Sequence, residues 1–228
     1  MVDPPRCHLS IKSQVCQLLG CSDHDTEGEW GQLPARKAVN ALFSFLYSTD
    51  HRLKWCAVGA MGKMVARLAD EDLEAARNVV RRLMWSLNDE SGGIGWGSPE
   101  AMGEILARHA GLAREYAHIL LSYAREDGNL LENDGLLRGV LWGLTRVAET
   151  RPELYRDAAR HITVHLQSRD GGVRALAVEL LGLLGDATVR DRLQGLADDQ
   201  TEVTRFSQGC EQRLRIADLA AQAVARLG

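Results

Sequence analysis

The sequence has little that would suit a membrane or a nucleic-acid backbone. No apolar run approaches the ~20 residues that a transmembrane helix needs, and the N-terminus lacks the apolar segment of a signal peptide. The 27 Lys and Arg are outnumbered by 31 Asp and Glu, which disfavours binding of nucleic acid through bulk positive charge. We therefore expect a cytoplasmic protein that binds no membrane.

Cysteine is scarce, and its five positions do not form a recognisable set. An odd number of thiols in a chain of 228 residues argues against a disulfide framework. Cys7, Cys16, Cys21 and His24 lie near one another in sequence, but they lack the short Cys-x-x-Cys spacing of zinc sites. Buried, unreactive cysteines are the favoured interpretation, and a metal or redox role is the alternative.

What the sequence does have is one periodicity, and it is helical. Leu73, Ala76, Val80, Leu83 and Leu87 step by three and four and so form one apolar stripe. Similar stripes recur toward the C-terminus, whereas alternating runs between hairpin turns are absent. With 45% apolar residues, a chain of this length can bury a continuous core. The pattern predicts an all-α protein without strands.

Proline, glycine and cap residues set the expected helix boundaries. Four of the five prolines lie at the starts of helical patterns, where a missing N–H costs little. Gly185 followed by Asp186 predicts a helix end and the next cap, and Thr150 to Glu153 fits a capping box. The expected helices cover residues 8–20, 33–48, 51–68, 71–88, 98–108, 111–126, 135–149, 152–167, 172–184, 187–197 and 211–227.

These helices fall into pairs that recur. The first helices begin near residues 51, 98, 135, 172 and 211, which is the spacing of two-helix solenoid repeats. Small residues inside them, such as Gly143 and Gly182, indicate close packing of one helix on the next. We expect one solenoid over residues 1–228, with helix pairs over 51–228 and capping helices, or a separate docking arm, over 1–50.

One segment resembles a known repeat. Residues 170–186 read DGGVRALAVELLGLLGD, and residues 224–228 echo the end of that motif. The segment is similar to the HEAT-like repeat named after phycobilisome (PBS) lyases. That resemblance implies an α-α superhelix, a HEAT-like helical-repeat solenoid used mainly for binding. It carries no activity over to this chain.

A glycine-rich segment with two tryptophans near it interrupts the repeats. Residues 92–97 contain four glycines, so the backbone there can approach another group closely. Trp85 lies off the apolar stripe of its helix, and Trp96 lies within the glycine segment. Trp96 either folds back to fill the seam between two repeats or acts, with Trp85, as an aromatic anchor for a partner.

Connections between repeats emerge on one edge of a solenoid, so residues 89–98, 127–134 and 168–172 should lie side by side. This edge is rich in acidic side chains, among them Asp89, Glu90, Glu132 and Asp134. Ordinary solvated helix caps are the favoured interpretation. Binding of a cationic partner or a divalent ion is the alternative.

Catalytic signatures are absent. No Gly-x-Ser-x-Gly segment is present. His161 and His165 are four residues apart and could share zinc on one helix face. However, the Glu that follows the first His of a zinc-protease helix is missing, and so are the His-Glu dipeptides of iron-dependent HEAT-repeat hydroxylases. We favour a surface or seam role for the pair and expect no cofactor.

The favoured function is a non-catalytic scaffold that binds a protein or peptide on a concave face, lined by the second helix of each pair, and on the loop edge. An accessory protein that binds a cofactor or tetrapyrrole is the alternative that the lyase resemblance implies, and a HEAT-like DNA-binding protein is less favoured. The candidate contact residues are Trp85, Asn88, Asp89, Glu90, Trp96, Glu100, Glu104, Tyr116, Tyr123, Glu132 and Trp142.

Overall fold

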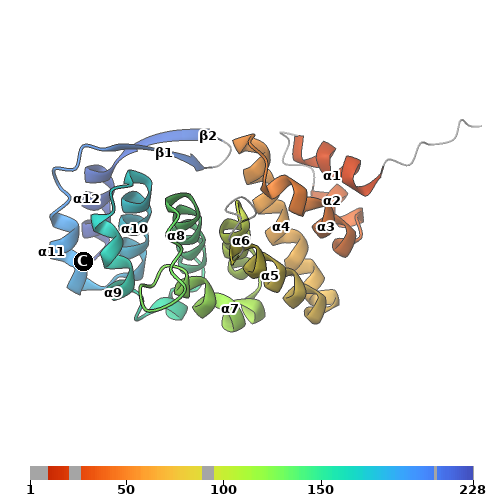
Figure 1. The fold of residues 1–228 in the computed structure, drawn as a ribbon, viewed down its shortest axis with the longest axis horizontal. Helices are drawn as coiled ribbons and strands as arrows, with labels where there is room; N and C mark the ends of the chain where they lie inside the picture. The colour runs from red at the N-terminus through yellow and green to blue at the C-terminus, as the bar shows by residue number, and fades with distance from the viewer. Residues whose placement is uncertain (1–9, 21–26, 89–94, 208–209, 228) are drawn as a thin grey trace, which may run out of the picture.

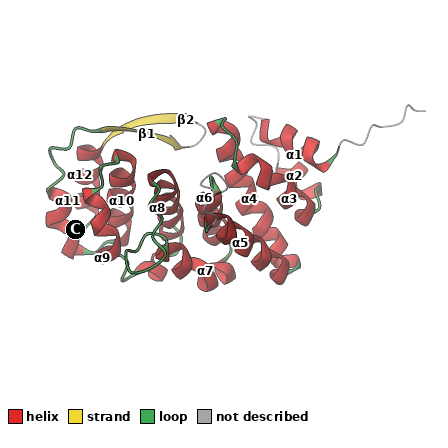
Figure 2. Ribbon diagram, viewed as in Figure 1, coloured by secondary structure: helices red, strands yellow, loops and turns green. Residues whose placement is uncertain are grey.

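The computed structural model describes residues 10–20, 27–88, 95–207 and 210–227. Helices form a row with α1 at one end and α11 and α12 at the other (Figures 1 and 2). No helix in the described part of the chain is both long and apolar enough to cross a lipid bilayer. The elements are α1 (Ile11–Gly20), α2 (Glu27–Gln32), α3 (Ala35–Leu46), α4 (His51–Glu71), α5 (Leu73–Leu87), α6 (Ser98–Arg108), α7 (Ala110–Ser122), α8 (Asp134–Ala148), η2 (Pro152–Tyr155), α9 (Ala159–Ile162), η3 (Thr163–Gln167), α10 (Gly171–Leu184), η4 (Ala187–Val189), α11 (Arg190–Gln194), β1 (Glu202–Ser207), β2 (Cys210–Arg215) and α12 (Ile216–Arg226).

The helices form two layers. The first layer consists of α4, α6, α8, α10 and α12, each packed against the next. In the second layer, α5 contacts both α4 and α6, and α7 contacts both α6 and α8. Each of these two helices thus covers the seam between two repeats, so neighbouring repeats share one hydrophobic core. The predicted all-α solenoid of stacked helix pairs is confirmed.

Small residues allow the first-layer helices to pack at very short range. A Cβ added at Gly103 of α6 would lie 2.3 Å from the Cα of Gly143 in α8. Similarly, a Cβ at Gly182 of α10 would lie 2.8 Å from the Cβ of Ala223 in α12. No larger residue fits where two backbones meet this closely. The predicted reason for glycine inside these helices is therefore confirmed at Gly143 and Gly182.

Side chains cap three of the first-layer helices, α4, α8 and α10, at their N-termini, whereas α6 and α12 have no side-chain cap. The carboxylate of Asp50 accepts from the Leu53 N–H at the start of α4, and Asp170 does the same for Val173 at the start of α10. Such caps satisfy backbone donors that have no partner within the helix. Gly185 ends α10 with a φ of 70°, and Asp186 caps the turn that follows, as predicted.

Helices α1, α2 and α3 lie within the first 50 residues and form the N-terminal end of the row. α3 packs along α4, and α1 contacts α3. Val15 and Leu19 of α1 are buried. That these residues cap the solenoid stays a prediction, and burial of the α1 stripe is the feature that agrees with it.

The β-hairpin near the C-terminus contradicts the predicted absence of strands. β1 and β2 pair antiparallel, with Val203 opposite Leu214, so the helix predicted over 211–227 is wrong in its first turns. α12 begins only at Ile216. Residues 202–207 do contain β-branched and aromatic residues, but Leu214 and Ala217 also continue the helical stripe by steps of three. Pairing with a second strand decided between these two patterns.

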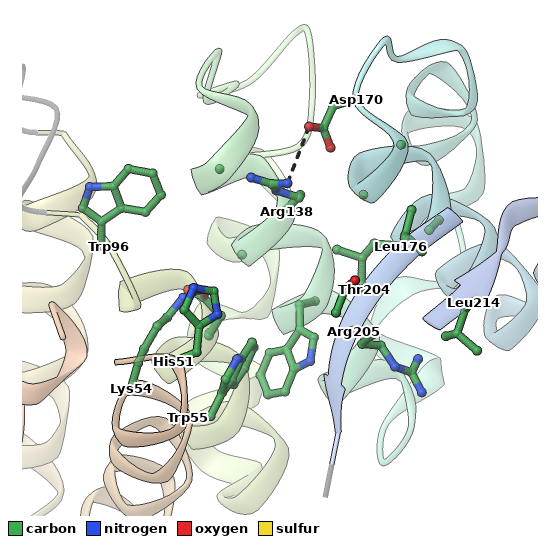
Figure 3. A pocket seen from close by; sticks show the side chains of 18 of the residues that line it. His51, Lys54, Trp55, Trp96, Arg138, Asp170, Leu176, Thr204, Arg205 and Leu214 are labelled. Carbon is green, nitrogen blue, oxygen red and sulfur yellow. Dashed lines mark hydrogen bonds and ion pairs between the residues drawn. The ribbon is translucent and has the colours of Figure 1, made fainter. Parts of the chain in front are cut away.

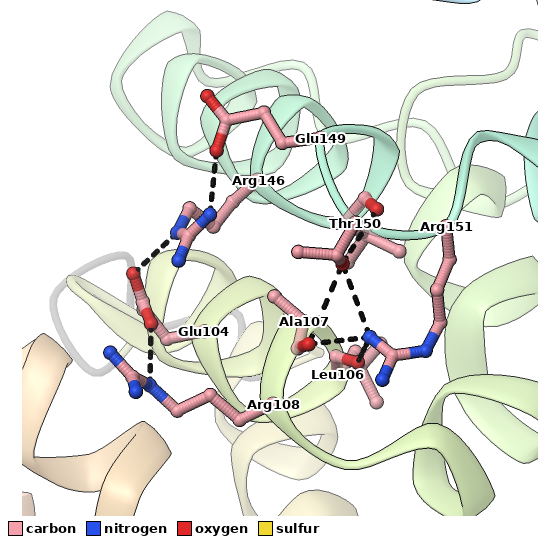
Figure 4. Close-up of polar contacts among 9 residues, drawn as sticks. Glu104, Leu106, Ala107, Arg108, Arg146, Glu149, Thr150 and Arg151 are labelled. Carbon is pink, nitrogen blue, oxygen red and sulfur yellow. Dashed lines mark hydrogen bonds and ion pairs between the residues drawn. The ribbon is translucent and has the colours of Figure 1, made fainter.

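Between α8 and α10 the chain forms the short helical segments η2, α9 and η3, so the single long helix predicted over 152–167 is wrong. The predicted capping box at Thr150 does not form either. The Thr150 hydroxyl is directed instead at the carbonyl oxygens of Val147, at 3.1 Å, and Ala107, at 3.5 Å. The Arg151 guanidinium also donates to the Ala107 carbonyl (Figure 4). These contacts tie the end of α8 to α6 and use the side chain that would have capped a new helix.

Candidate functional site: a groove at the helix N-termini

A groove of about 980 Å³ lies between the start of α4 and the hairpin (Figure 3). Most of its lining comes from α4, α6, α8, α10 and β1, and the rest comes from residues 46–49, Trp96, Asp170, Thr201, Leu214 and Leu219. These four helices are the first helices of their pairs, and the second helices, which are predicted to line the concave face, contribute no residue to this groove. Because small residues let the first helices pack most closely on one another, these helices form the continuous layer that borders the groove.

Two tryptophans meet in the groove from repeats that are far apart in sequence. The rings of Trp55 in α4 and Trp142 in α8 have their centroids 4.7 Å apart and are tilted by 53°. The Lys54 ammonium lies 5.1 Å from the centroid of the Trp55 ring, within the range of a cation–π contact. Both indoles are only partly buried. The pair therefore offers aromatic surface in a recess.

Ion pairs connect neighbouring helices along the groove. The Lys54 ammonium lies 2.6 Å from a carboxylate oxygen of Glu100 and joins α4 to α6. The Arg138 guanidinium lies 3.6 Å from Asp170 and joins α8 to α10. Charges paired in this way cancel one another at short range. What the groove then offers a ligand at these positions is mainly the aromatic surface.

A third ion pair ties the hairpin to the helices. The Arg205 guanidinium of β1 donates to the Glu179 carboxylate of α10. The Glu179 side chain is only 13% exposed. Burial raises the pKa of this carboxyl group, and the nearby Arg205 charge offsets part of the rise. The hairpin is thus held over α10 by a mostly buried charge pair.

Glycines in α8 make room for the side chains of the groove. A Cβ at Gly135 would lie 2.6 Å from the Trp96 ring, and a Cβ at Gly139 would lie 2.7 Å from the Glu100 carboxylate. Trp96 therefore lies across the start of α8, as expected if it fills a seam between repeats. It also remains 39% exposed and lines the groove, so its indole is available to a ligand.

The structure separates the other predicted contact residues into different surroundings. Trp85 is 77% exposed on α5, and Asn88 ends that helix, but neither lines the groove. Glu132 is exposed just before α8. Asp89 and Glu90 lie outside the described residues.

Four of the predicted contact residues are buried. Tyr116 and Tyr123 are 7% and 2% exposed and belong to the hydrophobic core, so they offer almost no surface to a partner. Glu100 is buried at the groove beside Lys54. Glu104 is buried away from the groove lining and accepts from two arginines, one on each side (Figure 4). Those contacts are 3.0 Å from Arg108 and 2.8 Å from Arg146.

The histidine pair and the cysteines occupy separate places. His165 is buried, and its Nε2 lies 2.7 Å from the carbonyl oxygen of Ala124. His161 Nδ1 lies 3.8 Å from Asp127, and burial together with nearby arginines lowers the pKa of His161. Cys16 is exposed on α1, while Cys7, Cys21 and His24 lie outside the described residues. Within the described chain, no three His, Cys, Asp or Glu side chains are arranged to hold a metal.

Sequence reasoning missed Lys54, Trp55 and Arg205 as groove residues. Trp55 and Trp142 each lie in the first helix of a pair. Comparing the first helices with one another would have shown that both carry a tryptophan. Arg205 could not be found in this way, because its place depends on a hairpin that the helical pattern obscured.

Comparison of the sequence with known proteins finds a relative but no family. No protein-family model matches the chain. Over 181 residues it is 28% identical to an uncharacterized protein of Archaeoglobus fulgidus, an alignment that covers 78% of this chain and 91% of that protein.

Solved structures of similar fold include designed armadillo repeat proteins. An engineered protein from a structural genomics consortium has a TM-score of 0.53 at 16% identity, covering 95% of this chain and 96% of that chain. A designed armadillo repeat protein has a TM-score of 0.52 at 16% identity, covering 96% and 100%. Another designed armadillo repeat protein, in complex with the peptide (KR)4, has a TM-score of 0.52 at 13% identity, also covering 96% and 100%. These similarities show the fold alone.

Proposed function

We propose that the protein is a scaffold that binds a peptide segment of a partner protein in the groove. The observation that carries this proposal is the partly exposed Trp55–Trp142 pair, set among charged side chains that are paired with one another. Tryptophan is enriched among the residues that contribute most to binding free energy at interfaces. The groove volume of about 980 Å³ is at the upper end of the roughly 300–1,000 Å³ typical of ligand pockets, which suits several peptide residues.

The architecture supports a peptide ligand. Stacked helix layers create extended open surfaces, and such surfaces are what helical repeat proteins use for binding. A designed armadillo repeat protein of similar fold forms a complex with the peptide (KR)4. Because a fold does not by itself fix a function, that complex is only a precedent for a peptide in such a groove.

We also propose that residues 170–186 are a repeat of the PBS lyase HEAT-like type. Asp170 accepts from the Val173 N–H at 2.8 Å, and the Arg174 guanidinium lies 2.9 Å from Asp199. The final glycine of the motif, Gly185, takes the positive φ that ends the helix. The motif residues therefore serve helix capping and packing between repeats, which supports the likeness as a structural one.

Selection from a phage library of random peptides on the immobilised protein tests peptide binding. Titration calorimetry then gives the affinity of a selected peptide for the wild type and for Trp142→Ala. Removing an aromatic anchor should weaken binding by at least roughly tenfold. Trp85→Ala is the matched control, because Trp85 is 77% exposed and lies outside the groove lining.

Binding to Trp85→Ala should equal that of the wild type. If the library yields no binder, or if both substitutions leave the affinity unchanged, the proposal is wrong. Thermal unfolding of Trp142→Ala confirms that the variant is folded at the temperature of the titration.

A further inference from the structure

The hairpin turns the edge of one strand toward the groove. Five consecutive residues, Thr201 to Arg205, line it, while β2 contributes only Leu214. Successive side chains of a strand point to opposite faces, so a strand that faced the groove with one face would contribute every second residue. Consecutive lining residues are expected when the backbone edge itself borders the space. Figure 3 shows Thr204 and Arg205 beside the groove side chains.

The register identifies which backbone groups lie on that edge. The Ile216 N–H donates to the Thr201 carbonyl at 3.1 Å, so these two residues form a hydrogen-bonded pair at the base of the hairpin. Such pairs alternate along an antiparallel ladder, which makes Val203 with Leu214 the next one. The N–H and C=O groups of Glu202 and Thr204 therefore point away from β2. Among the described residues, no other element forms a backbone hydrogen bond with Glu202 or Thr204.

We propose that the ligand binds as a third strand along β1. An extended peptide would exchange backbone hydrogen bonds with Glu202 and Thr204, as in other cases where a peptide adds to an open sheet edge. Alternate side chains of the peptide would then face the Trp55–Trp142 pair. This inference rests on the proposed function and specifies the conformation of the ligand.

The charges along the groove indicate the chemistry of the inward-facing side chain. Lys54 pairs with Glu100, Arg138 pairs with Asp170, and both pairs lie within the lining. A charged ligand side chain would have to displace one of these partners and lose water, which is costly without a new partner. We therefore expect an uncharged apolar or aromatic residue opposite the tryptophans, and we expect the peptide (KR)4 to bind more weakly than a selected peptide.

The hairpin is anchored well enough to present its edge. Arg205 is tied to Glu179 of α10, and a Val203 methyl carbon lies 3.4 Å from the position that a Cβ on Gly171 would occupy. Both anchors point to the helix face of the hairpin, and neither uses the outward backbone groups of Glu202 and Thr204. A strand held in this way can accept a partner without first being ordered.

Thr204→Pro tests strand addition directly. Proline removes the outward N–H of residue 204, and it removes no bond to β2, because that N–H does not take part in the β1–β2 ladder. The selected peptide should bind Thr204→Pro roughly tenfold or more weakly than the wild type. Thr204→Val keeps the N–H and the β-branched shape, so it should bind like the wild type.

A second measurement does not depend on the folding of a variant. The selected peptide is synthesised with a methyl group on one backbone nitrogen at a time and titrated into the wild-type protein. An added strand directs every second N–H toward its neighbour, so strong and weak losses of affinity should alternate along the peptide. Losses without alternation, or equal binding to Thr204→Pro and the wild type, would overturn the inference.

The two proposals fail differently. If Trp142→Ala loses affinity while Thr204→Pro keeps it, the groove binds peptides but not by strand addition. If the library yields no binder, both proposals are wrong. Size-exclusion chromatography covers one further outcome: a wild-type dimer that Thr204→Pro converts to monomer would show that a second copy of this chain occupies the edge, which also overturns the inference.

Discussion

Two contacts near the groove are stabilised by different interactions, close backbone packing in one and an ion pair in the other. Where α6 meets α8, backbone packs on backbone, with the Cα of Gly143 only 2.3 Å from where a Cβ on Gly103 would lie. Where β1 meets α10, the contact includes the Arg205–Glu179 ion pair and the Val203 side chain beside Gly171. Close backbone packing tolerates no added atom, whereas an ion pair depends on pH and on its partner. We therefore expect the helix layer to be the rigid part of the groove and the hairpin the part that opens first.

The largest effect should come from the helix seam. Gly103→Ala places a methyl group against the α8 backbone, where no flexible side chain can yield, so it should lower the free energy of unfolding by about 3 kcal/mol. Gly59→Ala in α4 is the matched control, because a Cβ there meets nothing within 4 Å. It should be neutral or stabilising by about 0.5–1 kcal/mol. Urea unfolding measures both, and similar values for the two would contradict a rigid seam.

A smaller, local effect should follow from removing the hairpin anchor. Arg205→Ala leaves the mostly buried Glu179 carboxylate without this partner, which should cost about 1–3 kcal/mol. Hydrogen exchange of the β1 amides should become faster while that of α8 stays the same. Arg215→Ala is the control within the same hairpin, because its pair with Asp218 is about half exposed and should contribute little. Equal acceleration in α8 would argue against independent opening of the hairpin.

The cost of Arg205→Ala should also depend on pH. Burial raises the pKa of Glu179 in the folded protein, so folded protein binds this proton at a higher pH than unfolded protein does. The contribution of Glu179 to stability therefore falls as the pH rises through the interval between the two values. Without Arg205 the pKa should rise further and widen that interval. The difference in unfolding free energy between wild type and Arg205→Ala should thus be larger at about pH 7 than at about pH 4.

Removing the Asp170 cap of α10 should lower the stability by an intermediate amount. Two substitutions separate the contribution of the cap from that of the ion pair. Asp170→Ala removes both the cap of α10 and the pair with Arg138, and it should cost about 1 kcal/mol. Asp170→Asn retains a capping side chain and loses only the charge, so most of the stability should return. Thermal unfolding of the two variants measures the difference. If Asn is as destabilising as Ala, the ion pair rather than the cap accounts for the loss.

The smallest effect on stability should come from removing an exposed ion pair, Arg125–Asp127. The Arg125 guanidinium donates to Asp127 and lowers the pKa of that carboxyl to about 2. Any stability it contributes is present above the unfolded pKa and is lost as the pH falls toward 2. In Arg125→Ala the pKa of Asp127 should return toward its ordinary value of about 3.8, with hardly any change in melting temperature. NMR titration of the carboxyl group tests this, and an unchanged pKa would contradict the assigned cause.

Local patterns predicted the helix layer well. The helix expected over residues 98–108 has those bounds, because Pro99 and the apolar period act within the segment itself. The predicted roles of Gly143 and Gly182 followed from the cost of glycine inside a helix. Burial was harder to foresee, since Tyr116 and Tyr123 carry no local sign of whether their stripe faces the core or a partner.

The amino-acid sequence by itself determined that the chain forms stacked helices, because helical period, caps and close-packing glycines are properties of short segments. Only the tertiary structure decided what the groove contains. The Trp55–Trp142 contact joins α4 to α8, and the Arg205–Glu179 pair needs a strand that forms only when β2 is beside it. Contacts between distant segments depend on how whole helices pack, and no local period encodes that arrangement.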